Sequence, residues 1–331
     1  PWNIPIARIT RQAGPALAAG CTIVIKPAAE TPLCALALAV LAEQAGIPAG
    51  VINIVTSHQA SAVGNELCSN PVVRKLSFTG STRIGKLLMR QCADTMKKLS
   101  LELGGNAPFI VFDDADLDAA VAGALASKYR NAGQTCVCAN RILVQASVYD
   151  AFAEKLTAAV KAFKVGDGMA EGTQIGPLIN PAAASKVAEL VQQSVAAGAE
   201  VLLGGEAHPA GPLFYRPTIL GKVDKTNPIL QEEIFGPVAP LVRFESEAEA
   251  IAIANDTPYG LAAYFYGRDI ARVWRVAEQL EYGMVGINEG IISTELAPFG
   301  GIKESGLGRE GAAEGLEEYL ETKYLCFGAI R

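Results

Sequence analysis

The sequence predicts an α/β fold made of two domains, the first of them built on a parallel sheet. Its 331 residues exceed the length of one ordinary domain. Half of them are hydrophobic and 19% are charged, which is a folded, globular composition. From residue 21 onward, β-branched segments alternate with helical segments, a rhythm typical of parallel strands joined by right-handed crossovers.

The first third of the chain contains three strand-and-helix pairs. The helix that follows the first strand has Thr31 as its N-cap, Pro32 in its first turn and Gly46 after its end. Dinucleotide-binding domains are built from units of this kind. The predicted strands are 21–26, 51–55 and 75–79, and the predicted helices are 31–46, 59–68 and 82–93.

A second α/β region follows a glycine hinge at Gly104-Gly105 and begins with the strand 107–112. The last apolar segment, Thr322 to Phe327, is a strand suited to pairing at an edge with another chain. The other predicted strands of this region are 141–145, 200–203, 238–244 and 261–266, and its helices are 116–131, 148–163, 181–197 and 247–255.

Charge and composition exclude several classes of function. The net charge of -6 gives no basic surface for nucleic acid, and no apolar run is long enough to cross a bilayer. Seven scattered cysteines indicate reduced thiols in a cytosol-like compartment. Only two histidines are present, so we expect no metal site and no Ser-His-Asp triad.

One glycine-rich segment has two interpretations. The run from Gly80 to Lys86 follows a strand, opens a helix and fits the phosphate loop of nucleotide hydrolases. That loop requires Ser or Thr next, to hold magnesium, and the chain has Leu87. A glycine turn at a helix N-terminus also suits a dinucleotide pyrophosphate, or it is a plain strand-to-helix turn.

Three residues could carry chemistry. Cys136 lies in a glycine-bearing loop and can present a thiolate, although it could equally be a small apolar filler. Glu102 stands in an apolar stretch beside the hinge, where a buried carboxylate can act as a base; its alternative is a surface carboxylate at a strand end. Asn3 can stabilise an oxyanion, but Asn is also a common turn residue.

Seven short motifs, taken in order, resemble those of the NAD(P)-dependent aldehyde dehydrogenases. They are PWN, KP, FTGS, LELGG, GQTC, EEIFGP and PFGG, and they run from residue 1 to the tail. Within this superfamily the chain is most similar to succinate-semialdehyde dehydrogenases, on the runs RNAGQTCVC (130–138) and NEGIIS (288–293). The resemblance implies a Rossmann-type cofactor domain (1–104), a catalytic domain (105–303) and a return to the cofactor domain with an oligomerisation strand (304–331).

The resemblance also implies a mechanism. Cys136 attacks the aldehyde, and Asn3 with the Cys136 backbone N–H holds the oxyanion. Hydride passes to the nicotinamide, and Glu102 activates the water that hydrolyses the thioester. The residues implied for the cofactor are Lys26 and Ala29 on the adenosine side, Gly80 and Ser81 at the pyrophosphate, and Glu233 and Phe235 at the nicotinamide ribose, together with Trp2.

A semialdehyde with a distal carboxylate needs a cationic clamp, for which arginine is suited. Arg11 and Arg130 match the positions of the family's clamp, with Ser293 as a hydroxyl donor. The alternative for Arg130 is a helix-end arginine that bonds carbonyls. Glutarate semialdehyde is the nearest competing substrate, because one methylene discriminates by only ~1–3 kcal/mol.

Two departures from the family pattern affect the cofactor and regulation. NAD-preferring members carry Glu three residues after the strand-end lysine, where this chain has Ala29, followed by Glu30. We therefore expect NADP to be accepted and preferred over NAD, with Glu30 able to weaken this preference. Cys138 could form a reversible disulfide with Cys136, as in some relatives, or it could only pack.

The family's chains also have an N-terminal portion before PWN, which carries part of the cofactor domain and an oligomerisation hairpin. An inactive nucleotide-binding fragment is therefore one alternative, and a phosphate-loop hydrolase, a cofactor-free thioesterase and an enzyme acylating coenzyme A are others. For the full-length protein we expect a cytoplasmic homo-oligomer, dimer or tetramer, with the mitochondrial matrix as the alternative location. We expect a small semialdehyde as ligand, and neither nucleic acid nor membrane as partner.

Overall fold

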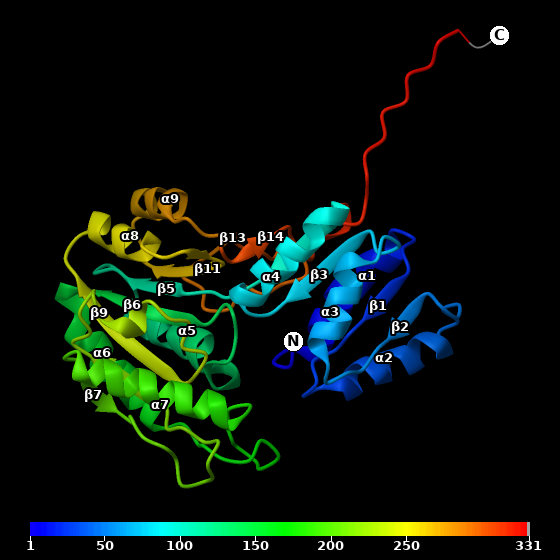
Figure 1. Cartoon of the computed structure of the whole chain (residues 1–331). Coiled ribbons are helices and arrows are strands. Elements are labelled where there is room, and N and C mark those ends of the chain that lie inside the picture. The colour runs from blue at the N-terminus through cyan, green and yellow to red at the C-terminus, as the bar shows by residue number, and fades with distance from the viewer. Residues whose placement is uncertain (330–331) are drawn as a thin grey trace. The chain divides into compact units, whose positions relative to one another are not determined.

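The computed structural model describes residues 1–329, which divide into two compact units (Figure 1). Of the described residues, the smaller unit comprises 1–101, 294–299 and 307–329. The larger unit comprises residues 102–293 and 300–306. The chain therefore crosses between the units more than once, and its last segments return to the smaller one.

The larger unit is built on a seven-stranded sheet of order β12-β11-β5-β6-β9-β8-β7 (Figure 1). All neighbours in it are parallel except β7 and β8, which form an antiparallel edge. Its central strands are buried on both faces, as expected for a parallel sheet covered by helices. The strands are β5 (Ala107–Val111), β6 (Ala139–Gln145), β7 (Glu200–Leu203), β8 (Thr218–Gly221), β9 (Val238–Phe244), β11 (Ala262–Tyr266) and β12 (Met284–Ile287).

Helices lie on both sides of this sheet. Helices α8 and α9 lie on one side, and α5 and α6 lie on the other (Figure 1). The short strands β10 (Tyr259–Gly260) and β13 (Ile302–Lys303) pair antiparallel outside the main sheet. The helices are α5 (Leu117–Tyr129), α6 (Tyr149–Lys161), α7 (Pro181–Ala196), α8 (Glu247–Asn255) and α9 (Ile270–Gln279).

The smaller unit contains two small sheets rather than the single parallel sheet that the sequence predicts. Strands β1 (Ile23–Ile25) and β2 (Ile52–Ile54) pair in parallel over three residues each. Strand β3 (Lys75–Thr79) belongs to a separate sheet of order β14-β4-β3, with β4 (Lys98–Glu102) and β14 (Gly306–Leu307). The helices are α1 (Pro5–Ala18), α2 (Pro32–Gln44), α3 (Ala60–Ser69), α4 (Thr82–Cys92) and α10 (Glu314–Glu317).

Several predicted elements match the structure, and others were missed. The bounds of β3, β7, β9 and α8 are as predicted, and the other predicted helices end within a few residues of the observed ones. Helix α1 was missed because it contains Pro15 and because the apolar run 14–25 crosses from its end into β1. Strands β8 and β12 and helix α9 were also not predicted.

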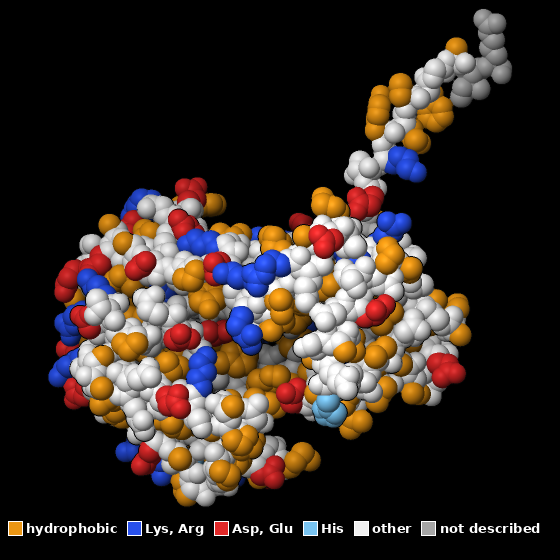
Figure 2. Space-filling view, viewed as in Figure 1, with side chains coloured by type: hydrophobic (Ala, Val, Ile, Leu, Met, Phe, Trp, Pro, Cys, Tyr) orange, Lys and Arg blue, Asp and Glu red, His pale blue; other side chains and the backbone are white. Residues whose placement is uncertain are grey.

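The predicted C-terminal strand, Thr322–Phe327, lies in no strand of the single chain. A strand requires hydrogen bonds from a neighbouring strand, and the other described residues offer this segment none. Its side chains Tyr324, Leu325 and Phe327 are strongly exposed, and Figure 2 shows apolar groups along the extended tail. Pairing with a second copy therefore stays a prediction.

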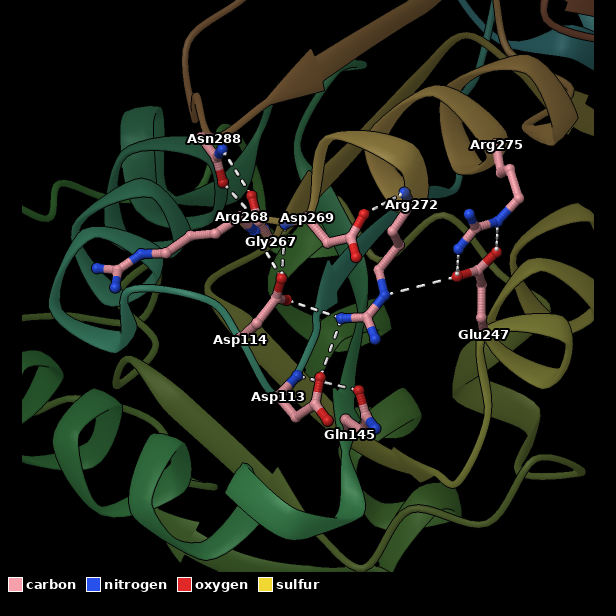
Figure 3. A network of polar contacts seen from close by, with 10 residues as sticks. All are labelled: Asp113, Asp114, Gln145, Glu247, Gly267, Arg268, Asp269, Arg272, Arg275 and Asn288. Carbon is pink, nitrogen blue, oxygen red and sulfur yellow. Dashed lines mark hydrogen bonds and ion pairs between the residues drawn. The ribbon is translucent and has the colours of Figure 1, made fainter.

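A charged network fixes α9 at the end of β5 (Figure 3). The Arg272 guanidinium lies 2.9 Å from Asp113 and 2.7 Å from Asp114, which directly follow β5. The Asp114 carboxylate also accepts the Arg268 and Asp269 backbone N–H groups. The loop that precedes α9 is thereby tied to the chain just after the end of β5, a central strand, which positions the first turn of the helix.

No helix in residues 1–329 is long and apolar enough to cross a membrane.

Arg141 is the largest polar group in the core of the larger unit, with 2% of it exposed. Its guanidinium donates to the carbonyls of Asn106, Ile253 and Ala254 at 2.7–3.2 Å. These bonds join β6, the residue before β5 and the end of α8. They help to satisfy these buried carbonyl groups, of which that of Ala254 also accepts the Tyr282 hydroxyl.

We predict that Arg141→Met lowers the free energy of unfolding by about 3 kcal/mol or more, because the carbonyls of Asn106 and Ile253 lose the guanidinium that donates to them. The matched control is Arg243→Met on β9, an exposed arginine paired with Asp150 at 3.2 Å, which should cost less than about 1 kcal/mol. Urea unfolding measures both. Equal losses of unfolding free energy in the two variants would show that the buried hydrogen bonds of Arg141 stabilise the fold no more than an exposed ion pair does.

Candidate active site

Glu102 ends β4, and its side chain is buried, with 2% exposed. The alternative of a surface carboxylate is therefore wrong. The residues that follow are held by Ser305, whose carbonyl accepts the Leu103 N–H at 2.9 Å and whose hydroxyl donates to the Gly104 carbonyl at 2.7 Å. The backbone that carries the carboxylate is thus fixed on both sides of the predicted hinge.

Gly105 lies against the loop that carries Cys136. A β-carbon on Gly105 would stand 2.4 Å from the Cys136 carbonyl oxygen, so only glycine fits. The Gly105 N–H donates to the Glu233 carboxylate at 3.1 Å. The larger unit therefore gathers Cys136 and Glu233 around a residue three positions after Glu102.

The loop before Cys136 has an uncommon backbone. Asn131, Ala132 and Gly133 have φ values of 52°, 54° and 76°, in the left-handed region. A β-carbon on Gly133 would stand 2.1 Å from the Gly236 carbonyl oxygen. Such conformations are costly for residues other than glycine, and the surrounding contacts must hold them in place.

Those contacts come mainly from Gln134. Its side-chain amide donates to the Asn131 carbonyl at 3.0 Å and to the Pro177 carbonyl at 3.3 Å, and its oxygen accepts the Ile179 N–H at 2.9 Å. On the other side of Cys136, the Tyr264 hydroxyl donates to the Val137 carbonyl at 2.7 Å. The half-buried Cys136 is therefore presented from a backbone that is pinned on both sides.

Two asparagines that sequence reasoning did not single out hold the EEIFGP loop. The Asn140 side chain donates to the Glu232 carbonyl at 2.7 Å and to the Asn106 side chain at 2.6 Å, and it accepts the Ile234 N–H at 3.0 Å. Both asparagines are buried. Their only signal in the sequence is nearness to motifs, Asn106 after LELGG and Asn140 after GQTC.

The Glu233 carboxyl is perturbed. Burial raises its pKa to about 7, against the opposing effects of the Gly105 N–H and of Lys186 and Lys128. Lys186 also donates to the Glu233 carbonyl at 2.6 Å. Phe235, two residues later, has a φ of 53° and is half-buried. A carboxyl poised near neutrality, close to the loop of a cysteine, is a mark of a functional site.

Lys128 and Cys138 lie in the interior behind this loop. Lys128 is completely buried, and burial lowers its pKa. The Cys138 thiol donates to the Lys128 carbonyl at 3.0 Å, and burial raises its pKa. A buried thiol of this kind packs well and is slow to react. The disulfide with Cys136 stays a prediction, and all seven cysteines are free in the structure.

The two clamp residues of the larger unit are tied to helix α5. Arg130 is the exposed C-cap of that helix, six residues before Cys136. Ser293 is half-buried and follows a loop in which Gly290 packs on Gly123 of α5, where a β-carbon would stand 2.4 Å from the Gly123 carbonyl oxygen. One helix therefore supports both segments.

In the smaller unit, the predicted cofactor residues follow strand ends. Lys26 comes directly after β1, and its ammonium donates to the Pro27 carbonyl at 3.0 Å; Ala29 is exposed in the same loop. Gly80 and Ser81 join β3 to α4. Ser81 is the N-cap residue of α4, although its hydroxyl makes no capping bond to the first turn.

The remaining predicted residues of the smaller unit lie at its start. Trp2 and Asn3 are half-buried just before α1. Arg11 of α1 stacks on Phe299 of the PFGG motif, 4.5 Å from the ring centre. Arg8, which sequence reasoning missed, is buried and forms an ion pair with Glu310. The sequence gives no clear signal for this pair, because Arg11 and Gln12 lie on the same face of α1 as Arg8.

Among residues 1–329, no group of three or more histidine, cysteine or acidic side chains could hold a metal ion.

The model of the aldehyde dehydrogenase family matches residues 1–325. The chain belongs to this family. The family and fold predictions are therefore confirmed, and the alternative of a phosphate-loop hydrolase is rejected.

Individual members of the aldehyde dehydrogenase family are very similar to this chain. The NADP(+) succinate-semialdehyde dehydrogenase of Escherichia coli is 66% identical, over 99% of this chain and 68% of that protein. The glutarate-semialdehyde dehydrogenase of Pseudomonas aeruginosa is 64% identical, over 100% and 68%. The crystal structure of succinate-semialdehyde dehydrogenase from Burkholderia pseudomallei has a TM-score of 0.98 at 61% identity, over 99% and 68%. The chain thus spans about two thirds of each.

The Glu233 pKa makes a prediction about stability. Below pH 4.5 the carboxyl is protonated in the folded and the unfolded chain. Between pH 4.5 and 7 only the folded chain keeps the proton, so its contribution to stability is lost as the pH rises through 7. Glu233→Gln removes this loss. The variant should match wild type near pH 5 and exceed it by about 2 kcal/mol at pH 8.5, allowing for partial exposure.

Urea unfolding at a series of pH values measures this difference. The matched control is Glu232→Gln, at the exposed neighbouring residue, which should follow the pH dependence of wild type. A constant difference between Glu233→Gln and wild type at every pH would show that Glu233 is not the group that titrates.

Proposed function

We propose that this chain carries the catalytic and cofactor-binding residues for NADP-dependent oxidation of succinate semialdehyde to succinate. The single observation that carries the proposal is the gathering of a half-buried cysteine, Cys136, and a half-buried carboxyl, Glu233, around Gly105, close after the buried Glu102. The names of the relatives at 66% and 61% identity support the substrate and, for the first, the cofactor.

The proposed reaction begins at Cys136. Its thiolate attacks the aldehyde carbon, the C–S bond forms, and the carbonyl oxygen becomes an oxyanion held by the Cys136 backbone N–H. Loss of hydride from that carbon leaves a thioester on Cys136. Glu102 then takes a proton from water, which adds to the thioester, breaks the C–S bond and releases the carboxylic acid. Asn3 keeps the oxyanion role that the resemblance assigns to it.

Bound NADP supplies the acceptor for the hydride. The residues present fit the adenosine half of such a cofactor, because a hollow of about 270 Å³ lies where β1 and β2 end. The carboxyl ends of parallel strands are where α/β sheets bind dinucleotides. Lys26 would bond the adenosine ribose, Gly80 and Ser81 would hold the pyrophosphate, and Glu233 would bond the nicotinamide ribose, with Trp2 and Phe235 nearby on the resemblance.

The division of the chain supports the same proposal. We infer that the smaller unit is the cofactor domain and the larger unit the catalytic domain. We also infer an assembly of two or four copies, with the exposed segment 322–327 as pairing strand, in the cytoplasm or the mitochondrial matrix. Free cysteines throughout the described residues suit the reducing interior of either compartment.

We predict that absorbance at 340 nm rises when the protein is mixed with succinate semialdehyde and NADP, and rises more slowly with NAD. Cys136→Ala should lower kcat by at least ~10⁴-fold, because the nucleophile is lost. The matched control is Cys138→Ala, which removes the buried neighbouring thiol and should keep most of the activity. A flat trace for wild type would support the inactive-fragment alternative.

A second prediction concerns the substrate clamp. Arg130 is exposed and makes no ion pair within residues 1–329, so its guanidinium is available to a carboxylate. Arg130→Leu should raise KM for succinate semialdehyde by about 10- to 100-fold, since a charge-assisted hydrogen bond is lost. KM for butanal, which lacks the carboxylate, should stay unchanged. An equal rise in KM for both aldehydes would show that Arg130 has a structural role and does not bind the substrate carboxylate.

Glutarate semialdehyde remains the second candidate substrate, because a relative named for it is 64% identical. The same assay with this aldehyde gives the ratio of the two kcat/KM values. A ratio in favour of the longer substrate would replace succinate semialdehyde in the proposal without changing the mechanism.

A further inference from the structure

The hollow at the ends of β1 and β2 has two walls. One wall is the loop after β1, which includes Ala29, together with the start of α2. The other wall is the loop after β2, which ends in His58. The Val55 N–H donates to the Ile25 carbonyl at 2.9 Å, so the two loops leave the sheet side by side.

His58 is the one titratable side chain in the lining of this hollow. The Ser57 hydroxyl accepts the Gln59 N–H at 2.9 Å, which sets the turn that presents His58. Helix α3 begins two residues later, at Ala60, so its positive end lies beside the imidazole. Both features favour an anion at this wall.

The side chain in the opposite wall does not distinguish the two cofactors. The methyl group of Ala29 can neither repel a phosphate, as a carboxylate would, nor donate a hydrogen bond to one. The charged residues next to this wall in the chain are Lys26, whose ammonium bonds the Pro27 carbonyl, and Glu30, which is exposed. One favours an anion and the other opposes it. A hydrogen-bond donor on the other wall, the loop after β2, would therefore decide whether the hollow favours a phosphate.

We infer that His58 is the residue that selects NADP over NAD, by donating an imidazole N–H to the 2′-phosphate of the adenosine ribose. This inference rests on the proposed function, since it assumes that the hollow receives adenosine. An imidazole has an N–H to donate whether it is neutral or charged, so the role does not depend on protonation. Glu30 then acts against His58 and limits the preference.

The test is isothermal titration of the full chain with two fragments of the cofactor, so that no turnover is needed. Adenosine 2′,5′-bisphosphate carries the 2′-phosphate, and 5′-AMP lacks it. His58→Ala should weaken binding of the bisphosphate by about tenfold and binding of 5′-AMP by less than twofold. His58→Gln, which keeps an N–H donor, should retain part of the difference. Glu30→Gln should tighten the bisphosphate by a few fold.

The matched control is His208→Ala, at the other histidine of the chain, which lies in the larger unit and should leave both affinities unchanged. Circular dichroism verifies that each variant is folded. If His58→Ala leaves bisphosphate binding unchanged, or weakens both ligands equally, the inference is overturned while the adenosine site stands. If wild type binds neither ligand, the cofactor site of the proposed function is overturned together with it.

Discussion

The absence of a side chain at Gly105 is the constraint on which the larger unit depends. Its backbone lies so close to the Cys136 carbonyl that a β-carbon would overlap it, and its N–H is bonded to Glu233. Three segments distant in sequence therefore meet at a point where no side chain intervenes. Because Ser305 fixes the residue before it, the position of Glu102 is set by the same contact.

Buried polar side chains support this contact, beginning with Asn106, the residue after Gly105. Asn106 and Asn140 bond each other, and Arg141 bonds the Asn106 carbonyl. Polar groups in the core are costly unless every partner is present, and here each bond also sets a position. The asparagines place the EEIFGP loop, and the arginine ties that placement to the sheet. Preorganisation of the site thus begins in the core of the unit.

Much of the fold could be predicted because local patterns were consistent with the final structure. The β-branched run of β3 and the capped helix α8 need no distant partner to be recognised. The candidate site residues could be proposed because the family's motifs keep their order along the chain. Asn106, Asn140 and Lys128 could not be found, because each acts through contacts with residues far away in sequence. Helix α1 was hidden by Pro15, and the extent of the small sheets depends on pairing that no single segment encodes.

The hollow at the ends of β1 and β2 has a consequence for how such a protein can change over evolution. Its walls are two short loops and the start of α2, and none of these carries any part of the cysteine chemistry. Under the proposal that this hollow receives the adenosine end of the cofactor, substitutions in its walls would change whether NADP or NAD accepts the hydride, while the cysteine chemistry stays the same. Under the same proposal, a few surface substitutions would be enough for related proteins to change from one nicotinamide cofactor to the other.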